Sequence, residues 1–334
     1  MERLLITLIL VCTMNNITNA QNPFYGQYHT PHEAVPFDRI ETEHYEPAIL
    51  EGIKLQNAEI EAIIQNPEKA DFTNTIEAFE ESGELLDKVV AVFGNMLSAE
   101  TNDDLQELAQ KIMPLLSEHS NNITLNEKLF ARVKEVYNQK ETLQLTQEQK
   151  QLLENAYNSF IRHGANLEGE AREEYRRLTT ELSKLTLTFS ENNLKETNAY
   201  QMLLTKKESL AGLPEIIIEA AAETAKNEEK EGWAFTLHAP SYIPFMTYSD
   251  NRDLRQKLYM AYNTKCTHDN EFNNIDIVKK IANTRMKIAQ LLGYKDYAEY
   301  TLKKRMAENR KSVYKLLNQL LEAYTPTAQQ EYKE

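Results

Sequence analysis

Apolar residues recur every three or four positions along most of this chain, which is the spacing of amphipathic α-helices. The clearest case lies between Asn74 and Leu97, where one stripe contains Ile76, Phe79, Gly83, Leu86, Val90, Phe93 and Leu97. Asn74 and Glu77 have the spacing of a capping box, so we predict a helix that begins there. Gly83 lies on the stripe, where it would allow a partner helix to approach closely.

The same spacing predicts further helices, with start signals ahead of several of them. They cover residues 45–65, from 102, 126–139, from 146 to 164, 168–193, 251–262, 274–292, 297–304 and from 309. Asn102 precedes two aspartates, and Thr146 with Gln149 forms a second capping box. Pro114 should kink the helix that starts at 102.

Two of these helices have distinctive faces. The first should pack through small residues, namely Ala48, Gly52, Leu55, Ala58 and Ala62. The longest, 168–193, has an apolar seam that predicts antiparallel helix packing, formed by Tyr175, Leu178, Leu182, Leu185 and Phe189. We interpret its many charged residues as a solvated face with pairs inside the helix.

The pattern changes between residues 198 and 250. Tyr200–Leu204 and Trp233–Leu237 have strand-like composition and flank a helix opened by Pro214. The chain has 9 glycines and 10 prolines in 334 residues, which favours long helices with short connections. We therefore predict a mainly α fold, a multi-helix domain with a small β element near 198–240.

Composition and charge exclude some classes of partner. Hydrophobic residues make up 41% and charged residues 26%, as in an ordinary globular protein. The net charge of −14 argues against nucleic acid, because phosphate contacts need clustered lysine and arginine. Beyond the first twenty residues, no stretch is apolar enough for a membrane span.

Residues 1–20 have the features of a secretory signal peptide. Arg3 precedes an apolar run through Cys12, and Thr18-Asn19-Ala20 ends in a small residue. We expect cleavage after Ala20, a mature region of residues 21–334, and a periplasmic or otherwise exported protein. Lipid attachment at Cys12 is the less favoured alternative, because Val11 is larger than the residue that lipoprotein processing requires.

Removal of the signal peptide would leave Cys266 as the only thiol, so no internal disulfide could form. His268 is two residues away, but closeness in sequence does not place an imidazole beside a sulfur. We expect Cys266 to be a structural thiol.

Two aromatic clusters allow two interpretations. Tyr242, Phe245 and Tyr248 lie beside prolines, and Tyr259 and Tyr262 flank Met260. Rings with polar tips suit contact with a peptide, whereas aromatic stripes more often mark a core. Core packing is the favoured prediction for both clusters.

A series of short motifs, in order along nearly the whole mature chain, resembles one enzyme family. The chain is similar to the amino-terminal part of the zinc metallopeptidases of the thimet oligopeptidase and peptidyl-dipeptidase family, particularly the bacterial peptidyl-dipeptidases, or dipeptidyl carboxypeptidases. Besides residues 66–102, the motifs are Pro36-Phe37, His44-Tyr45, Ala58-Glu59-Ile60, Leu125-Asn126, Arg132-Val133-Lys134, Leu145-Thr146, Ala211-Gly212-Leu213-Pro214, Pro240-Ser241-Tyr242, Asn251-Arg252, Leu291-Leu292-Gly293-Tyr294 and Met306-Ala307.

The catalytic signature of that family, H-E-x-x-H, does not occur in the chain. Of the seven histidines only His32 is followed by Glu, and Pro36 stands where the second histidine should be. A zinc helix needs two imidazoles one turn apart on the same face, and proline disfavours that helix. We therefore predict no catalytic, cofactor-binding or metal-binding residue here, and we interpret His29 and His32 as polar residues of an irregular arm.

The resemblance implies that these residues form one wall of a channel that admits short, unfolded peptides. Two histidines and a more distant glutamate would hold the catalytic zinc in a domain beyond residue 334, which would be the partner of this half. The whole enzyme would remove dipeptides from the carboxyl end of peptides, with endopeptidase action as a close variant. The 334-residue chain alone is then expected to bind no zinc and to be inactive.

A different class of function stays open. The chain could be a non-catalytic helical binding or scaffold protein related to that family. Glu334 follows a polar run without a helix stop signal, and for this reason we expect the natural gene to continue. The sequence just beyond Glu334 would decide between the two hypotheses.

Overall fold

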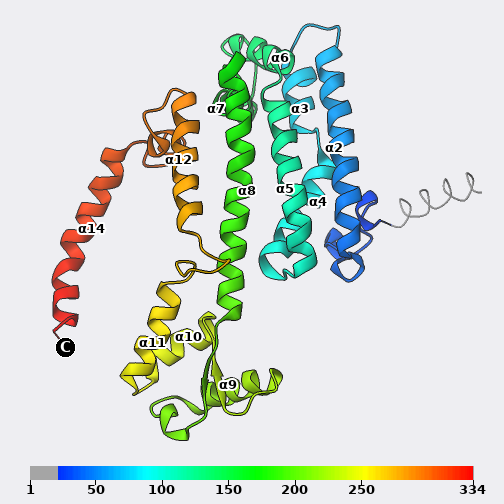
Figure 1. The fold of residues 1–334 in the computed structure, drawn as a ribbon. Helices are drawn as coiled ribbons and strands as arrows, with labels where there is room; N and C mark the ends of the chain where they lie inside the picture. The colour runs from blue at the N-terminus through cyan, green and yellow to red at the C-terminus, as the bar shows by residue number, and fades with distance from the viewer. Residues whose placement is uncertain (1–21, 334) are drawn as a thin grey trace, which may run out of the picture. The chain divides into compact units, whose positions relative to one another are not determined.

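The computed structural model describes residues 22–333, which divide into two compact units. Unit 1 contains the residues up to Ser183 and those from Met286 onward, and unit 2 contains Lys184–Arg285. The described chain is mainly helical with one small sheet, so the predicted fold class is confirmed (Figure 1). The predicted signal peptide lies outside the described residues. In the part of the chain that the structure describes, no helix is both long and apolar enough to cross a membrane.

Unit 1 consists of helices joined by short connections. Its elements are the 3-10 turns η1 Pro23–Tyr25, η2 Pro31–Glu33 and η3 Phe37–Arg39, and then α2 Thr42–Gln65, a π-helical turn Phe72–Glu77, α3 Ala78–Glu80, α4 Glu84–Ala99, α5 Asp103–Thr124, α6 Glu127–Asn138, α7 Gln147–Arg162, the first half of α8 Gly169–Ala199, the end of α12 Ile275–Leu291, α13 Tyr297–Leu302 and α14 Arg310–Glu331. Asn102, Asn126 and the Thr146–Gln149 box cap α5, α6 and α7. These predicted starts are confirmed, and α5 continues through Pro114.

The first described residues are fixed to the helices behind them. Asn22 is buried, and its Nδ2 donates a hydrogen bond of 2.8 Å to the backbone oxygen of His44. Phe24 is buried with its ring 5.4 Å from that of Tyr45, which in turn lies 5.2 Å from Phe93 of α4. This arm is therefore part of the core of unit 1.

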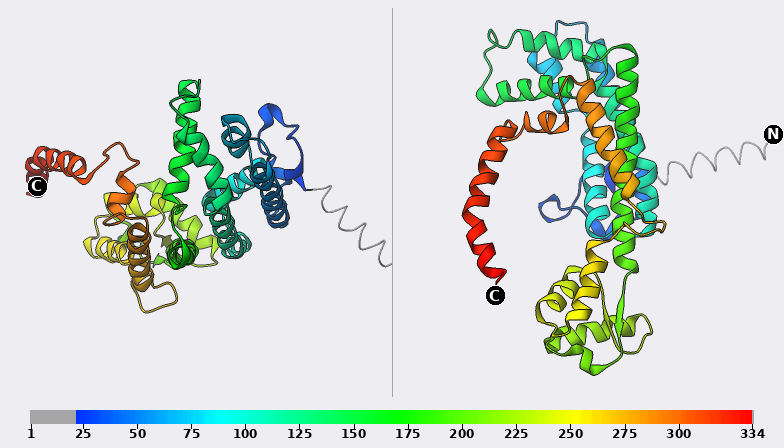
Figure 2. Two further views of the ribbon diagram at one scale, coloured as in Figure 1. Left: turned by 90° about the horizontal axis from the view of Figure 1, so that it is seen from above. Right: turned by 60° about the vertical axis from the view of Figure 1, so that its left-hand side comes forward.

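The main core of unit 1 lies where α6 and α7 meet the residues around the π-helical turn. The ring of Phe160 lies 5.4 Å from Phe79 and 5.8 Å from Phe130. A second group of helices, α2, α4 and α5, packs side by side, as the views of Figure 2 show. Along the seam predicted for α8, Tyr175 and Leu178 are buried and pack with Ile288 of α12.

The prediction of one helix from Asn74 to Leu97 is wrong. Asp71, not Glu77, forms the capping box with Asn74, and it opens the π-helical turn. Gly83 then breaks the helix with a left-handed φ of 87°, and α4 begins at Glu84. The Gly83 N–H donates to Glu59 Oε2 at 2.8 Å, so the break itself is held by α2. Only glycine takes this conformation without strain, which is why the residue ends a helix here.

The small-residue face predicted for α2 is only partly right. Ala48 and Gly52 are buried, but Leu55, Ala58 and Ala62 are exposed. The face that packs also uses larger residues, namely Tyr45, Ile49, Ile60 and Ile63. At Gly52 the backbone of α4 lies so close that a methyl group there would be 2.9 Å from the Leu86 Cα.

Unit 2 contains the predicted β element. The end of α8 leads into β1 Met202–Leu204, the turn η5 Lys207–Leu210, α9 Glu215–Asn227, β2 Trp233–Phe235, α10 Ala239–Tyr248, α11 Arg252–Asn263 and the start of α12. The strands pair antiparallel, with Met202 opposite Phe235 and Leu204 opposite Trp233. The core of unit 2 includes Phe235 and Phe245, whose rings meet edge to face at 4.6 Å.

Candidate functional site

The residues near a metal-like motif in the sequence do not form a metal site. His29 and His32 are exposed, and His32 belongs to the turn Pro31–Glu33. Among residues 22–333, no group of three or more His, Cys, Asp or Glu side chains is arranged to hold a metal ion.

The structure separates the two aromatic clusters into a core residue and a surface. Phe245 is fully buried and Tyr242 is partly buried against the core of unit 2, as predicted. Tyr248, Tyr259 and Tyr262 are not core residues, because 52%, 50% and 39% of each is exposed. Helical spacing alone could not distinguish these outcomes, since it marks a shared face without saying what covers it.

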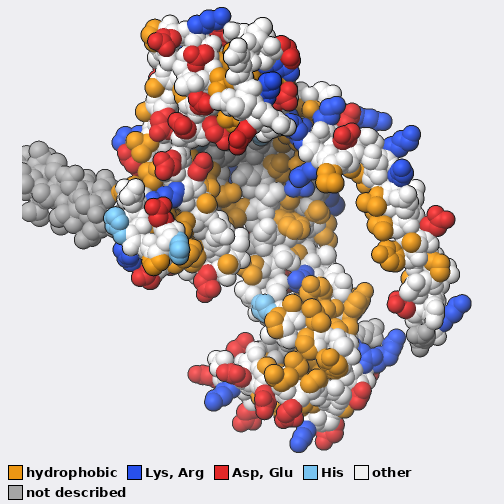
Figure 3. All heavy atoms as spheres, turned by 180° about the vertical axis from the view of Figure 1, so that it is seen from behind, with side chains coloured by type: hydrophobic (Ala, Val, Ile, Leu, Met, Phe, Trp, Pro, Cys, Tyr) orange, Lys and Arg blue, Asp and Glu red, His pale blue; other side chains and the backbone are white. Residues whose placement is uncertain are grey.

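Three tyrosines of α10 and α11 lie together on unit 2. The rings of Tyr242 and Tyr262 stack 4.2 Å apart at an interplanar angle of 20°. Burial raises the pKa of Tyr242, a hydrogen bond with Asn263 lowers it, and the hydroxyls of Tyr262 and Tyr259 raise it further. Met260 is half exposed beside them in sequence. We call Tyr242, Tyr259, Met260 and Tyr262 the tyrosine surface. Figure 3 shows that hydrophobic side chains gather over α10 and α11, the two helices that carry these residues.

Positive charge accompanies the tyrosine surface. Lys265 Nζ lies 4.6 Å from the centre of the Tyr262 ring, a cation–π contact. The segment from His238 to Lys265 contains four lysines and arginines but only two aspartates, in a chain with a net charge of −14. The surface therefore offers aromatic rings with hydroxyl tips next to the cation of Lys265.

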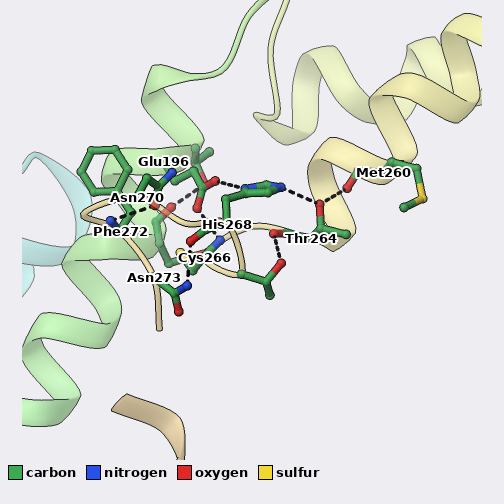
Figure 4. A network of polar contacts seen from close by, with 11 residues as sticks. Glu196, Met260, Thr264, Cys266, His268, Asn270, Phe272 and Asn273 are labelled. Carbon is green, nitrogen blue, oxygen red and sulfur yellow. Dashed lines mark hydrogen bonds and ion pairs between the residues drawn. The ribbon is translucent and has the colours of Figure 1, made fainter. Parts of the chain in front are cut away.

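Glu196 holds the loop that follows α11, as Figure 4 shows. Its Oε1 accepts a hydrogen bond of 2.6 Å from His268 Nδ1, and its Oε2 accepts one from the backbone N–H of Cys266. Burial alone would raise the pKa of Glu196, but these hydrogen bonds outweigh it and hold the pKa below its ordinary value. Lys265 Nζ also donates to Thr197 Oγ1 at 3.0 Å, so α8 fixes the lysine that faces Tyr262.

Cys266 is a structural thiol in this loop and not a nucleophile. It is buried, and burial together with the nearby Glu196 carboxylate raises its pKa to about 11. A reactive cysteine needs the opposite shift, toward the thiolate. His268 hydrogen-bonds Glu196 and also lies 3.2 Å from Thr264 Oγ1 through Nε2. The prediction for Cys266 agrees with this geometry, whereas the Glu196 contact carried no signal in the sequence.

Comparison with known proteins identifies the relatives of this chain. The sequence pattern of Peptidase family M3 matches residues 245–334. Dipeptidyl carboxypeptidase of Escherichia coli is 34% identical over 311 residues, which cover 93% of this chain and 46% of that protein. The chain is similar to members of peptidase family M3. Oligopeptidase A of Salmonella typhimurium is 30% identical over 314 residues, again 93% of this chain and 46% of that protein.

The resemblance to the M3 peptidases is thereby confirmed. The chain spans about half the length of the curated relatives it matches. The residues that match the M3 family pattern include α11, α13 and α14 and therefore Tyr259, Met260 and Tyr262 of the tyrosine surface, but not Tyr242.

Proposed function

We propose that this chain is the amino-terminal region of an exported, zinc-dependent M3 peptidase that hydrolyses short peptides and releases dipeptides from their carboxyl ends. The observation that carries the proposal is the similarity to dipeptidyl carboxypeptidase over 93% of the chain. Similarity to oligopeptidase A over the same share of the chain supports peptides as substrates, with endopeptidase action as the variant.

The described residues do not provide a zinc site, and so we assign the metal and the hydrolytic step to the part of the protein that follows Glu334. In the proposed enzyme, the helical region forms one wall of the channel that leads to the metal. It would select peptides by size and by their side chains, and it would keep bulk water away from the bond that is cleaved.

Helix α14 supports the proposal of a further part of the same protein. It carries an apolar stripe formed by Tyr314, Leu317, Leu320, Leu321 and Tyr324, and none of its described residues is buried. Leu321, for example, is 67% exposed. A helix of 22 residues with such a stripe is ordinarily stabilised by packing it against a partner. We propose that the catalytic half covers this stripe.

The test compares two proteins from the same gene, the 334-residue chain and its longest natural product. Each is purified and its zinc content is measured. Each is then incubated with a hexapeptide that is blocked at its amino end, and the products are identified by mass. We expect one zinc and successive loss of carboxyl-terminal dipeptides for the longer protein, and neither for the chain of 334 residues.

Two results would overturn the proposal. Stoichiometric zinc in the 334-residue chain would contradict the placement of the metal. A natural product that stops at Glu334 and cleaves nothing would favour the non-catalytic binding or scaffold protein. Export is tested separately, by comparing the periplasmic fraction of cells that express the protein with and without residues 1–20.

A further inference from the structure

We propose that the tyrosine surface binds an extended peptide through an aromatic or long aliphatic side chain that lies next to an acidic side chain. This inference rests on the proposed function for the idea that peptides are substrates, and it adds which peptides this region prefers. It concerns unit 2 alone.

The first support is the arrangement of the rings. Tyr242 and Tyr262 are already stacked, so binding need not order these two rings, and the half-exposed Tyr259 and Met260 add apolar area. Tyrosine has few rotatable bonds, and binding through it costs little conformational entropy. Because Lys265 and the core of unit 2 cover the outer faces of the stacked pair, an apolar side chain of a peptide would pack against the exposed edge of Tyr262 and against Tyr259.

The second support is the charge next to the rings. Lys265 is held by Thr197 and lies against the face of Tyr262. Arg252 and Lys257 of α11 are exposed together with Asp253, and α10 has no charged residue at all. A carboxylate on the bound peptide would therefore meet an excess of cations, whereas a basic side chain would be repelled.

The third support is the contrast with α14. Its stripe is rich in leucine, which suits permanent packing within one protein. Three of the five residues of that stripe are leucine, whereas three of the four residues of the tyrosine surface carry a hydroxyl group at the tip of a ring. Rings with polar tips are typical of surfaces that bind and release a partner.

The experiment measures binding without cleavage. Fluorescein-labelled octapeptides, all amidated at the carboxyl end, are titrated with the 334-residue chain, and anisotropy is recorded. The peptides share one sequence with Phe at its centre, and the neighbouring residue is Glu, Gln or Lys. We expect affinity in the order Glu, Gln, Lys.

The variants test the surface itself. The double variant Tyr259→Ser/Tyr262→Ser should weaken binding of the Glu peptide about tenfold. Tyr259→Phe/Tyr262→Phe keeps the rings and should bind nearly as the wild type. Tyr314→Ser/Tyr324→Ser removes two exposed tyrosines of α14 and is the matched control. Lys265→Gln should reduce the preference for Glu over Gln.

Two outcomes would overturn the inference. The first is equal affinity of the wild type and the Tyr259→Ser/Tyr262→Ser variant for the Glu peptide. The second is a preference for the Lys peptide. Loss of binding in the longer natural protein would show that another part of that protein covers the surface. If the longer protein cleaves nothing while peptide binding keeps this pattern, the proposed function fails and the inference about binding stands.

Discussion

Gly52 of α2 lies directly against Leu86 of α4. A methyl group at position 52 would lie 2.9 Å from the Leu86 Cα, which is closer than packed carbon atoms come. The two helices meet through backbone at this point, and the position of α4 depends on the absence of a side chain at residue 52.

Gly52→Ala should lower the free energy of unfolding by up to about 2 kcal/mol, since overpacking costs about 1 to 3 kcal/mol and a helical alanine returns about 1. Gly94 lies inside α4 with nothing within 4 Å of an added methyl group, so it is the matched control. Gly94→Ala should stabilise the protein by up to about 1 kcal/mol. Urea unfolding followed by circular dichroism measures both; equal effects would show that the helices can move apart.

Glu196→Gln should destabilise the protein at pH 7 by about 1 to 2 kcal/mol, because the carboxylate accepts hydrogen bonds from His268 and Cys266. The folded-state pKa of Glu196 lies below its ordinary value. Its stabilisation is therefore present above the unfolded-state pKa, about 4.3, and is lost as the pH falls through the folded-state pKa.

The pH dependence of the free energy of unfolding distinguishes the Glu196 carboxylate from the other carboxylates of the protein. Between pH 5.5 and 3 the wild type should lose more stability than Glu196→Gln, and the two curves should converge at the acidic end. Glu271→Gln, at an exposed position of the same loop, is the control and should follow the wild type. Parallel curves for the wild type and Glu196→Gln would contradict the assignment.

Cys266 should react with iodoacetamide at pH 7.5 more than about a hundredfold slower than a free cysteine, because its pKa is raised to about 11 and it is buried. The rate is measured by mass spectrometry on a Cys12→Ser chain, in which Cys266 is the only thiol. In 8 M urea the same chain should react at the ordinary rate. Rapid labelling of the folded protein would refute a structural role.

Leu317→Glu/Leu321→Glu should leave the stability of the 334-residue chain within about 0.5 kcal/mol, because both side chains are exposed on α14. In the longer natural protein the same pair should reduce stability and peptidase activity, since the proposed packing would bury two charges. Gln319→Glu is the control for added charge. Identical behaviour of the double variant in both proteins would exclude the proposed contact.

Local signals in the sequence predicted the helices of this protein well. Asn102, Asn126 and Thr146 start helices because each side chain accepts a hydrogen bond from a backbone N–H within three residues, which needs no distant partner. The strands at Met202–Leu204 and Trp233–Phe235 were also predictable from composition.

What depends on distant residues was not predictable. The spacing of Gly83 fitted a continuous stripe, yet Glu59 and Gln56 of α2 shape a helix break there. Likewise, Phe245 and Tyr248 lie on one short helix, but only Phe245 faces the Phe235 side of the core. The hydrogen bonds of Glu196 join residues about seventy positions apart, and no spacing rule connects them.

The buried anchor at Asn22 sets an order of events for the proposed export. Removal of a leader after Ala20 would cut the chain two residues ahead of a side chain that is bound to His44. A processing protease needs several residues of accessible, extended backbone on both sides of its cut. Maturation should therefore precede folding, and a precursor that folds first would keep its leader.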